Sequence, residues 1–506
     1  MTRARTRTAL LFTVVLALLV GIAVYAAFAT RDPAFSAPEP LDAAAPEGLE
    51  TYYTQDLDWS ECGTGHCTWV TVPIDYEKPD GATTRLRVKM YQGEDATRSL
   101  LVNPGGPGGP ATEFADVLYN RFSSDLLDAY DVVGVDPRGV GESTPLQCLS
   151  DEEFDEYTAE DADPTNAAEL RELRESFTAL GQACLDNSGE LAAHVSTVEV
   201  ARDMDVVRAL LGRSELDWFG ASYGTELGST YAELFPQTVG RMVLDGAVDP
   251  TLDGIESSFA QATGFQRALD AYVADCVTSD SCPLGSDAGG ANKRITDFLT
   301  SLEDDPLPGT DDRELTAGLA FYGIAVTLYD KETWSYLTQA LTAAFDGDGS
   351  VLMTLSDAYF GRQPDGTYAT NMGQVISAVT CLDSPGGLTE ADVRAQLPRF
   401  EKASPVFGGA LAWGALGCTD WPIEATNPVP EIDAAGAAPI LVVGTTRDPA
   451  TPYESAQALA SQLESGVLLT RDGDGHTAYL SGNTCIREAV DAYLLDGTVP
   501  AENTTC

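Results

Sequence analysis

Short apolar runs alternate with amphipathic stretches along most of the chain. Each run is a few residues long, and most are closely followed by Gly, Pro or Asp, a pattern typical of buried strands. The runs are Ser99–Val102, Asp131–Val135, Leu216–Phe219, Met242–Leu244, Ile440–Val443 and Val467–Leu469. Helical patterns lie between several of them, for example at Tyr223–Phe235. The alternation predicts an α/β fold with a mainly parallel central sheet and helices on both faces.

The strand rhythm lapses between about Pro250 and Pro439. This stretch consists of helical patterns rich in Ala, Leu and Asp, interrupted by Gly and Pro. A chain of 506 residues is longer than a single hydrophobic core usually supports. We therefore expect a mostly helical cap, 251–438, inserted between a first core part, 49–250, and a second core part, 439–506.

The N-terminus has the pattern of an export segment. Arg3, Arg5 and Arg7 precede an uncharged run from Ala9 to Ala29. Residues 1–30 are a signal peptide if they are cleaved at the small residues that end this run, or a signal anchor if they are not. Residues 31–48, rich in Ala, Pro and acid, are the expected linker. The protein is then secreted or anchored at the cell surface, and contacts a membrane only if the segment stays uncleaved.

Ten cysteines fit an oxidising compartment, where an even number favours disulfides. We expect sequence neighbours to pair: Cys62 with Cys67, Cys148 with Cys184, Cys276 with Cys282, Cys381 with Cys418, and Cys485 with Cys506. Zinc bound by Cys62, His66 and Cys67 is the alternative. No second cluster supplies a fourth ligand, so no metal is expected.

Charge excludes one class of partner. The chain has 29 Lys and Arg against 78 Asp and Glu, a formal net charge of −49. Nucleic acids bind to clustered cations, so a nucleic-acid partner is excluded. Hydrophobic residues make up 44% of the chain and charged residues 21%, as in an ordinary globular protein, which excludes a disordered one.

Candidate chemistry begins at Gly220-Ala221-Ser222-Tyr223-Gly224. This GxSxG string directly follows a predicted strand and directly precedes a predicted helix, the context of a nucleophile elbow. A serine on such a sharp turn projects above the sheet, and the flanking glycines keep neighbouring atoms clear of it. The alternative is an ordinary Gly/Ser turn. Placement between strand and helix favours Ser222 as a nucleophile.

A serine nucleophile needs a histidine as its base. The chain has three histidines. His476 lies in a Gly-rich loop after the Val467–Leu469 run, where the last member of a Ser, Asp, His order is expected. His66 lies inside a close Cys pair and His194 upstream of the elbow; we expect both at the surface.

The histidine in turn needs a carboxylate from a neighbouring loop. Asp448 follows the Ile440–Val443 strand and is the candidate. Asp472 and Asp474 are alternatives that lie very close to His476 in sequence. A helix cap before Pro449 is the structural alternative for Asp448.

An oxyanion site needs two fixed donors. The N–H of Tyr223, directly after the nucleophile, is one candidate. The glycine-rich loop after the Ser99–Val102 strand offers Gly106 or Gly105 as the other. A phosphate-binding loop is the alternative, but no Lys follows and the protein is strongly acidic.

Six ordered motifs carry a family resemblance: NPGGPGG, YDVVGVDPRGVGES, GASYGTELGSTYAELFP, VLDGAVDP, TTRDPATP and GHTAY. Over roughly residues 50–506 the chain resembles the secreted tripeptidyl aminopeptidases of the α/β-hydrolase superfamily, relatives of proline iminopeptidases. The resemblance implies the same three site residues, a cap over the site, a TAP-like C-terminal segment and no cofactor. It makes Thr451 a candidate supporting residue, with a hydroxyl at a helix start as the alternative. Proline iminopeptidases usually have His where this chain has Pro104.

Three functions are compatible with these residues. The first is a serine aminopeptidase that releases tripeptides from peptides with a free N-terminus. Such an enzyme must recognise an α-ammonium group, for which acidic cap residues are candidates, none of them singled out by the sequence. An extracellular esterase or lipase with the same triad is the second, and a non-catalytic binding protein on a hydrolase scaffold the third.

Overall fold

The computed structural model describes residues 35–41, 45–384, 386–425, 429–501 and 503–506. The expected export segment, 1–30, lies outside these residues. Within the described part of the chain, no helix is both long and apolar enough to cross a membrane. Part of the expected linker packs on the core, since Leu41 N donates to Ala209 O over 2.9 Å.

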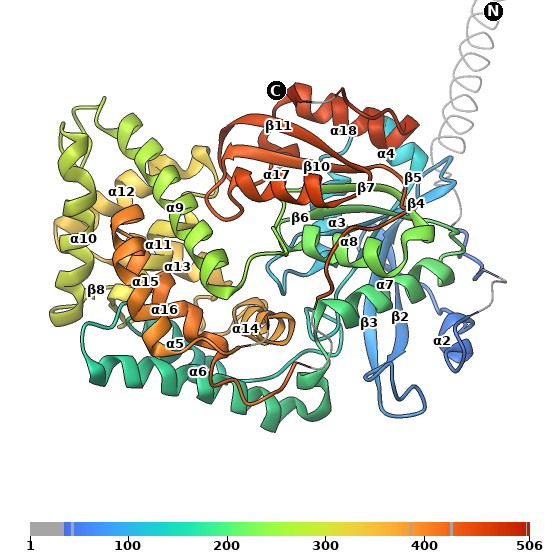
Figure 1. Cartoon of the computed structure of the whole chain (residues 1–506), viewed down its shortest axis with the longest axis horizontal. Helices are drawn as coiled ribbons and strands as arrows, with labels where there is room; N and C mark the ends of the chain where they lie inside the picture. The colour runs from blue at the N-terminus through green and yellow to red at the C-terminus, as the bar shows by residue number, and fades with distance from the viewer. Residues whose placement is uncertain (1–34, 42–44, 385, 426–428, 502) are drawn as a thin grey trace, which may run out of the picture. The chain divides into compact units, whose positions relative to one another are not determined.

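A ten-stranded sheet forms the core, in the order β1-β2-β3-β5-β4-β6-β7-β10-β11-β12 (Figure 1). The strands are β1 Ser60–Cys62, β2 Gly65–Pro73, β3 Thr83–Tyr91, β4 Arg98–Asn103, β5 Tyr130–Val135, β6 Leu216–Ala221, β7 Val239–Asp245, β10 Ile440–Arg447, β11 Gly466–Asp474 and β12 Thr504–Thr505. From β5 through β4 to β12 every neighbouring pair is parallel. The antiparallel pairs are β1 with β2, β2 with β3, and β3 with β5. The mainly parallel sheet was predicted correctly.

Strands β1 to β3 are absent from the sequence prediction for a physical reason. Along β3, buried and more exposed positions alternate, so the strand has no continuous apolar run. Strands β4 to β7 lie inside the sheet and are buried almost throughout, which gives the runs that the sequence shows.

Helices cover both faces of this sheet. On one face lie α3 Ala111–Tyr119, α4 Ser124–Ala129 and α18 Thr484–Asp496, which share a core cluster with the sheet. On the other lie α7 Thr197–Leu210, α8 Tyr223–Leu234 and α17 Tyr453–Gln462. Phe219 packs into the first layer, whereas the indole of its neighbour Trp218 donates to Gly224 O of α8 over 3.0 Å. Successive side chains of β6 thus point to opposite faces of the sheet and contact both helical layers.

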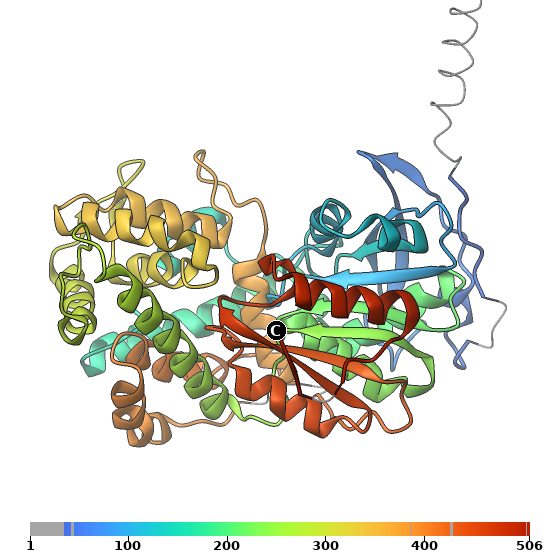
Figure 2. The ribbon, with the colours of Figure 1, turned by 90° about the horizontal axis from the view of Figure 1, so that it is seen from above.

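The cap lies beside the sheet, and its helices are seen together in two perpendicular views (Figure 1, Figure 2). They are α5 Asp151–Ala159, α6 Ala167–Ser188, α9 Gly254–Cys276, α10 Ala288–Asp304, α11 Ala317–Val326, α12 Trp334–Phe345, α13 Ser350–Phe360, α14 Met372–Asp383, α15 Glu390–Ala403 and α16 Gly408–Gly414. A short two-stranded sheet, β8 Leu307–Pro308 with β9 Glu314–Leu315, completes it. Helices α5 and α6 lie within the expected first core part, 49–250, but they pack against the cap helices α11 and α14. The cap is therefore built from two separate segments.

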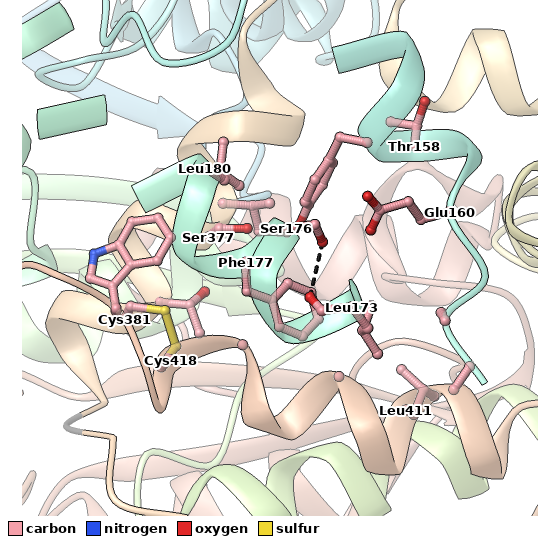
Figure 3. A pocket seen from close by; sticks show the side chains of 18 of the residues that line it. Thr158, Glu160, Leu173, Ser176, Phe177, Leu180, Ser377, Cys381, Leu411 and Cys418 are labelled. Carbon is pink, nitrogen blue, oxygen red and sulfur yellow. Dashed lines mark hydrogen bonds between the residues drawn. A yellow bond between two sulfur atoms is a disulfide. The ribbon is translucent and has the colours of Figure 1, made fainter. Parts of the chain in front are cut away.

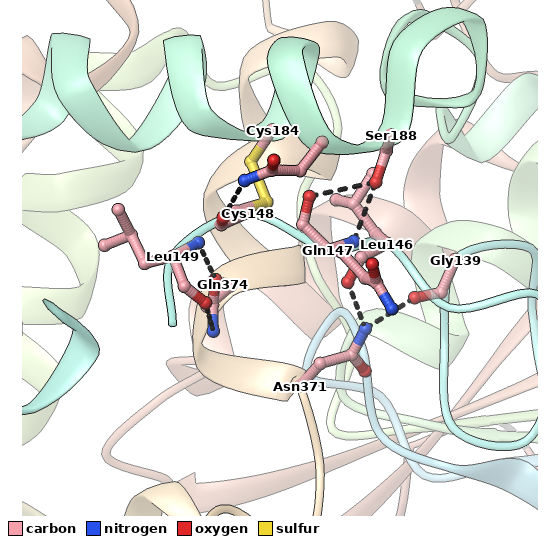
Figure 4. Close-up of a disulfide and its surroundings, with 10 residues drawn as sticks. Gly139, Leu146, Gln147, Cys148, Leu149, Cys184, Ser188, Asn371 and Gln374 are labelled. Carbon is pink, nitrogen blue, oxygen red and sulfur yellow. Dashed lines mark hydrogen bonds between the residues drawn. A yellow bond between two sulfur atoms is a disulfide. The ribbon is translucent and has the colours of Figure 1, made fainter. Parts of the chain in front are cut away.

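The structure joins the cysteines in the same five pairs as the sequence neighbours suggest. Cys148–Cys184 ties the chain before α5 to α6 (Figure 4). Beside it, the side-chain amide of Asn371 donates to the carbonyls of Gly139 and Leu146 over 2.8 and 2.9 Å. The start of α14 is thus fastened to the segment that leaves the core after β5.

Candidate active site

Ser222 occupies the turn between β6 and α8. Its backbone has φ 57° and ψ −125°, a conformation that residues other than glycine rarely adopt. Ser222 N donates to Asp245 O over 2.9 Å, and Thr225 N donates to Ser222 O over 2.8 Å. A Cβ on Gly220 would lie 2.1 Å from Gly224 O, so strand and helix approach as closely as these glycines allow. The turn has the geometry of a nucleophile elbow.

His476 and Asp448 contact each other directly. The Nδ1 atom of His476 lies 2.8 and 2.9 Å from the two carboxylate oxygens of Asp448. Asp448 is fully buried and also accepts hydrogen bonds from the N–H groups of Ala450, Thr451 and Thr477. The contact with this carboxylate holds Nδ1 as the protonated ring nitrogen, which leaves Nε2 as a base.

The free side of the histidine faces no protein partner. The side chain of His476 is 10% exposed, and its Nε2 has no hydrogen-bond partner among the described residues. The cap holds this loop from the other side, since His476 N donates to Tyr329 O over 2.7 Å and the Tyr329 ring stands edge-on to the imidazole. Burial lowers the pKa of His476, but Asp448 and then Asp245 outweigh burial and raise it above 6.5.

Ser222 and His476 lie around one short segment, Asp245-Gly246. The backbone N–H of Ser222 donates a hydrogen bond to Asp245 O, and a Cβ on Gly246 would lie 3.4 Å from the Cε1 atom of His476. No hydrogen bond joins the Ser222 hydroxyl to Nε2 within the described part of the chain. Such contacts are often loose without substrate.

The glycine-rich loop after β4 lies against the elbow. A Cβ on Gly105 would lie 2.6 Å from Ala221 O, 2.8 Å from Ser222 Cβ and 2.9 Å from Tyr223 N. Gly105 N already donates to the side chain of Asn103 over 2.9 Å, whereas no hydrogen bond between described residues uses the N–H of Gly106. Of the two glycines considered, Gly106 is thus the one with a free donor.

Thr451 touches the same pair. Its hydroxyl lies 3.3 Å from His476 Nδ1. The next helix, α17, begins at Tyr453 without a side-chain cap, so neither Thr451 nor Asp448 is its N-cap. Asp472 and Asp474, the alternative acids, pair with Arg447 instead of with the imidazole.

His194 corrects one prediction. It is buried, not at the surface, and its Nδ1 lies 3.4 Å from the Glu199 carboxylate. The paired acid stabilises a buried imidazole that the polar sequence around it does not reveal. His66 is half-buried, and the Cys62–Cys67 disulfide takes both thiols from the zinc set considered above.

Asp75, His194 and Glu199 form the one group of ligand atoms among the described residues that could hold a metal, with all atoms within 4.8 Å of one another. A guanidinium already lies there, with Arg138 Nη1 3.7 Å from Glu199. Since this cation is fully buried and also pairs with Asp203, the group forms an internal ion network.

Glu226, half-buried on α8, and Asp383, buried at the end of α14, are two acids that the sequence pattern did not single out. Glu226 follows Ser222 by one helical turn, which is the signal that could have identified it. Asp383 ends α14 of the cap and accepts hydrogen bonds from Thr197 N and Oγ1 over 2.8 and 2.7 Å. The Thr197 hydroxyl lies 2.5 Å from the phenol oxygen of Tyr223. Burial, together with the charge of Asp383, raises the pKa of Glu226 to about 8, and burial raises that of Asp383 to about 7.

A separate cavity of about 260 Å³ lies inside the cap (Figure 3). Helices α5, α6, α11, α14 and α16 line it, and the Cys381–Cys418 disulfide forms part of its wall. Ser377 of α14 faces this cavity, whereas Val375 of the same helix contacts Gly108 of the glycine-rich loop. One helix therefore divides the cap cavity from the candidate active site.

Comparisons with known proteins agree with this geometry. A family model described as alpha/beta hydrolase fold matches residues 98–313, and one described as TAP-like protein matches 404–506. Serine protease Hip1 of Mycobacterium tuberculosis is 37% identical over 478 residues, which cover 89% of this chain and 91% of the relative. Carboxylesterase B of the same organism is 38% identical and tripeptidyl aminopeptidase of Streptomyces lividans 32%; each match covers 89% of this chain, and 88% and 86% of the respective relative.

Proposed function

Because the chain belongs to the α/β-hydrolase family of the TAP-like proteins, we propose that it is an exported serine exopeptidase that releases tripeptides from free N-termini. Its relatives and its fold make it a serine hydrolase of the peptidase or esterase type. One observation supports the assignment of this activity to particular residues: Ser222 has a strained backbone on the elbow, and His476 and Asp448 form a buried, hydrogen-bonded pair beside it.

The proposed reaction is acyl transfer. The hydroxyl of Ser222 attacks the scissile carbonyl while Nε2 of His476 takes its proton, and Asp448 holds the imidazole in the required tautomer. The N–H groups of Tyr223 and Gly106 donate to the oxyanion. The imidazolium then gives its proton to the leaving amine, and the C–N bond breaks. Water, deprotonated by the same Nε2, cleaves the acyl-enzyme and restores the serine.

An extracellular esterase is the second candidate, because a relative of similar identity is named carboxylesterase. The same serine and histidine perform both reactions, so the triad does not separate them. A non-catalytic binding protein is a poorer proposal, because it would not need a strained serine beside a hydrogen-bonded Asp–His pair.

Chromogenic peptides with free and acetylated N-termini, assayed beside short and long acyl esters, test the proposal. Acetylation removes the ammonium charge, and we expect kcat/KM to fall at least about a hundredfold, equivalent to about 2.7 kcal/mol. Equal rates on free and acetylated peptides would indicate an endopeptidase. Faster cleavage of long acyl esters than of any peptide would indicate a lipase.

Export is proposed from residues 1–30. N-terminal sequencing of protein recovered from the culture medium and from membranes tests it. A mature N-terminus near residue 30 in the medium supports cleavage, and an intact N-terminus in the membrane fraction supports an anchor. Full-length protein in the cytoplasm alone would contradict both.

A further inference from the structure

Helix α14 lies on the side of the cap that faces the sheet (Figure 1). Its start lies against the glycine-rich loop, since a Cβ on Gly108 would lie 3.0 Å from Val375 Cβ and 3.1 Å from Met372 Cα. Its last residue, Asp383, accepts hydrogen bonds from the N–H and the hydroxyl of Thr197, the first residue of α7. Both ends of this cap helix therefore contact the core.

A chain of hydrogen bonds runs from Asp383 to the phenol of Tyr223. The Oγ1 atom of Thr197 donates to Asp383 over 2.7 Å and lies 2.5 Å from the phenol oxygen of Tyr223. A hydroxyl has one proton to donate, and that of Thr197 goes to Asp383, so the phenol of Tyr223 donates to Thr197. All three residues are buried, and each bond in a chain shielded from water counts for more than it would at the surface.

The backbone N–H of Tyr223 is the proposed oxyanion donor at the other end of the same residue. Tyr223 is the first residue of α8, and the first N–H groups of a helix have no acceptor within that helix. No hydrogen bond between described residues uses this N–H. Because the phenol is anchored to Thr197, the position of the ring limits how far the N–H can move.

The elbow needs such an anchor because the backbone of Ser222 is strained, with φ 57°. A strained conformation persists only where the surrounding structure holds it. Ser222 is held by backbone hydrogen bonds to Asp245 and Thr225, and the phenol of Tyr223 adds a hold at the next residue. The second proposed donor, Gly106, lies on the loop that α14 contacts at Gly108. The same cap helix thus bears on both proposed oxyanion donors.

We propose that Asp383 and Thr197 are positioning residues that fix the N–H of Tyr223 in the oxyanion site, so that this site is complete only when α14 is seated on the core. The inference rests on the acyl transfer at Ser222 proposed above and applies to peptide and ester substrates alike. An oxyanion donor acts on the transition state more than on the bound substrate. Loss of its position therefore lowers kcat and leaves KM nearly unchanged.

Tyr223→Phe and Thr197→Val test the chain, assayed on the best peptide or ester substrate of the wild type. The first variant keeps the ring and the backbone N–H, and the second keeps the shape of the side chain. We expect each to lower kcat about tenfold, less than the roughly 10² to 10³ for outright loss of a donor. The two hydroxyls act in series, so kcat of the double variant should lie within about twofold of the lower single variant.

Tyr231→Phe is the matched control on the same helix. The phenol of Tyr231 donates to Asp205 over 3.1 Å and lies 2.7 Å from the Thr238 hydroxyl, so the substitution removes comparable hydrogen bonds away from the elbow. It should lower the free energy of unfolding in a urea titration and keep the wild-type kcat. Thr197→Ser should recover most of the kcat that Thr197→Val loses, because serine keeps the hydroxyl.

The cap end of the chain is tested by Asp383→Asn, which leaves one of the two Thr197 donors without its acceptor and should lower kcat as Thr197→Val does. If Asp383→Asn does not fold, the Thr197 variants decide, because the Thr197 hydroxyl is the group that joins α14 to Tyr223.

Three results would overturn the inference: more than half of the wild-type kcat in Tyr223→Phe, a Thr197→Ser as slow as Thr197→Val, or losses that multiply to about a hundredfold in the double variant. A wild type that cleaves esters but no peptide would overturn the exopeptidase function alone, and the same variants then decide this inference on the ester. A wild type that cleaves neither would overturn the proposed acyl transfer, and this inference with it.

Discussion

Replacing Gly105 by Ala tests the contact between the glycine-rich loop and the elbow. At this position φ is +96°, and the new Cβ would lie 2.6 Å from Ala221 O, 2.8 Å from Ser222 Cβ and 2.9 Å from Tyr223 N. Real Cβ atoms essentially never come within 3.0 Å of such neighbours. Each of them belongs to the elbow and none is the far end of a flexible side chain, so the loop or the elbow must move.

The size of the effect follows from which atoms move. A shift of a few tenths of an ångström separates the N–H groups of Tyr223 and Gly106, which are the proposed oxyanion donors. Loss of one such donor lowers kcat by about 10² to 10³. The strained backbone adds about 1–3 kcal/mol of lost stability. We therefore expect kcat of Gly105→Ala to fall by about 10² to 10³, with a smaller change in KM.

Gly482→Ala is the control, because Gly482 also has a positive φ, +80°, but a Cβ there meets nothing within 4 Å. The free energy of unfolding from urea titration and kcat on one peptide are measured for both variants. Gly482→Ala should lose stability and keep its kcat. If Gly105→Ala retains more than half of the wild-type kcat, the proposed oxyanion geometry is wrong.

Two further predictions concern the base and the cap. Because Asp448 raises the pKa of His476, kcat/KM of the wild type should decrease as the pH falls through a value above 6.5. Asp448→Asn should lower kcat by about 10⁴ and move this acid limb to lower pH; an unchanged limb would contradict the role of Asp448. Cys381→Ser with Cys418→Ser opens a disulfide that spans 37 residues of the cap, and should lower the free energy of unfolding by about 2–4 kcal/mol in non-reducing urea titrations. An unfolding free energy equal to that of the wild type would contradict this estimate.

The site residues could be predicted because each follows a strand in the sequence. Ser222 and Asp448 come directly after β6 and β10, and His476 is the second residue after β11. The carboxyl ends of parallel strands lie at one edge of a sheet. The local sequence was therefore enough to predict these three site residues. The run of glycines likewise indicated the loop after β4. The choice of Gly106 over Gly105 as oxyanion donor needed the structure, in which Gly105 N already donates to Asn103.

What the sequence did not reveal depends on contacts between distant segments. His194 is buried beside Glu199 and Asp75, and the polar helical stretch around it gives no sign of this. Asp383 reaches Thr197 only because α14 packs on the core, 186 residues away in sequence. No periodicity in a single segment encodes such a contact.

The central claim is that Ser222 is the nucleophile, and active-site labelling tests it most directly. A fluorophosphonate probe is added to the pure wild type and to Ser222→Ala, and the adduct is located by peptide mapping with mass spectrometry. We predict about one equivalent of label on Ser222 in the wild type, no label in Ser222→Ala, and a fall in kcat of about 10⁴ to 10⁶ for the variant. Label on another serine, or more than a tenth of wild-type activity in Ser222→Ala, would contradict the claim.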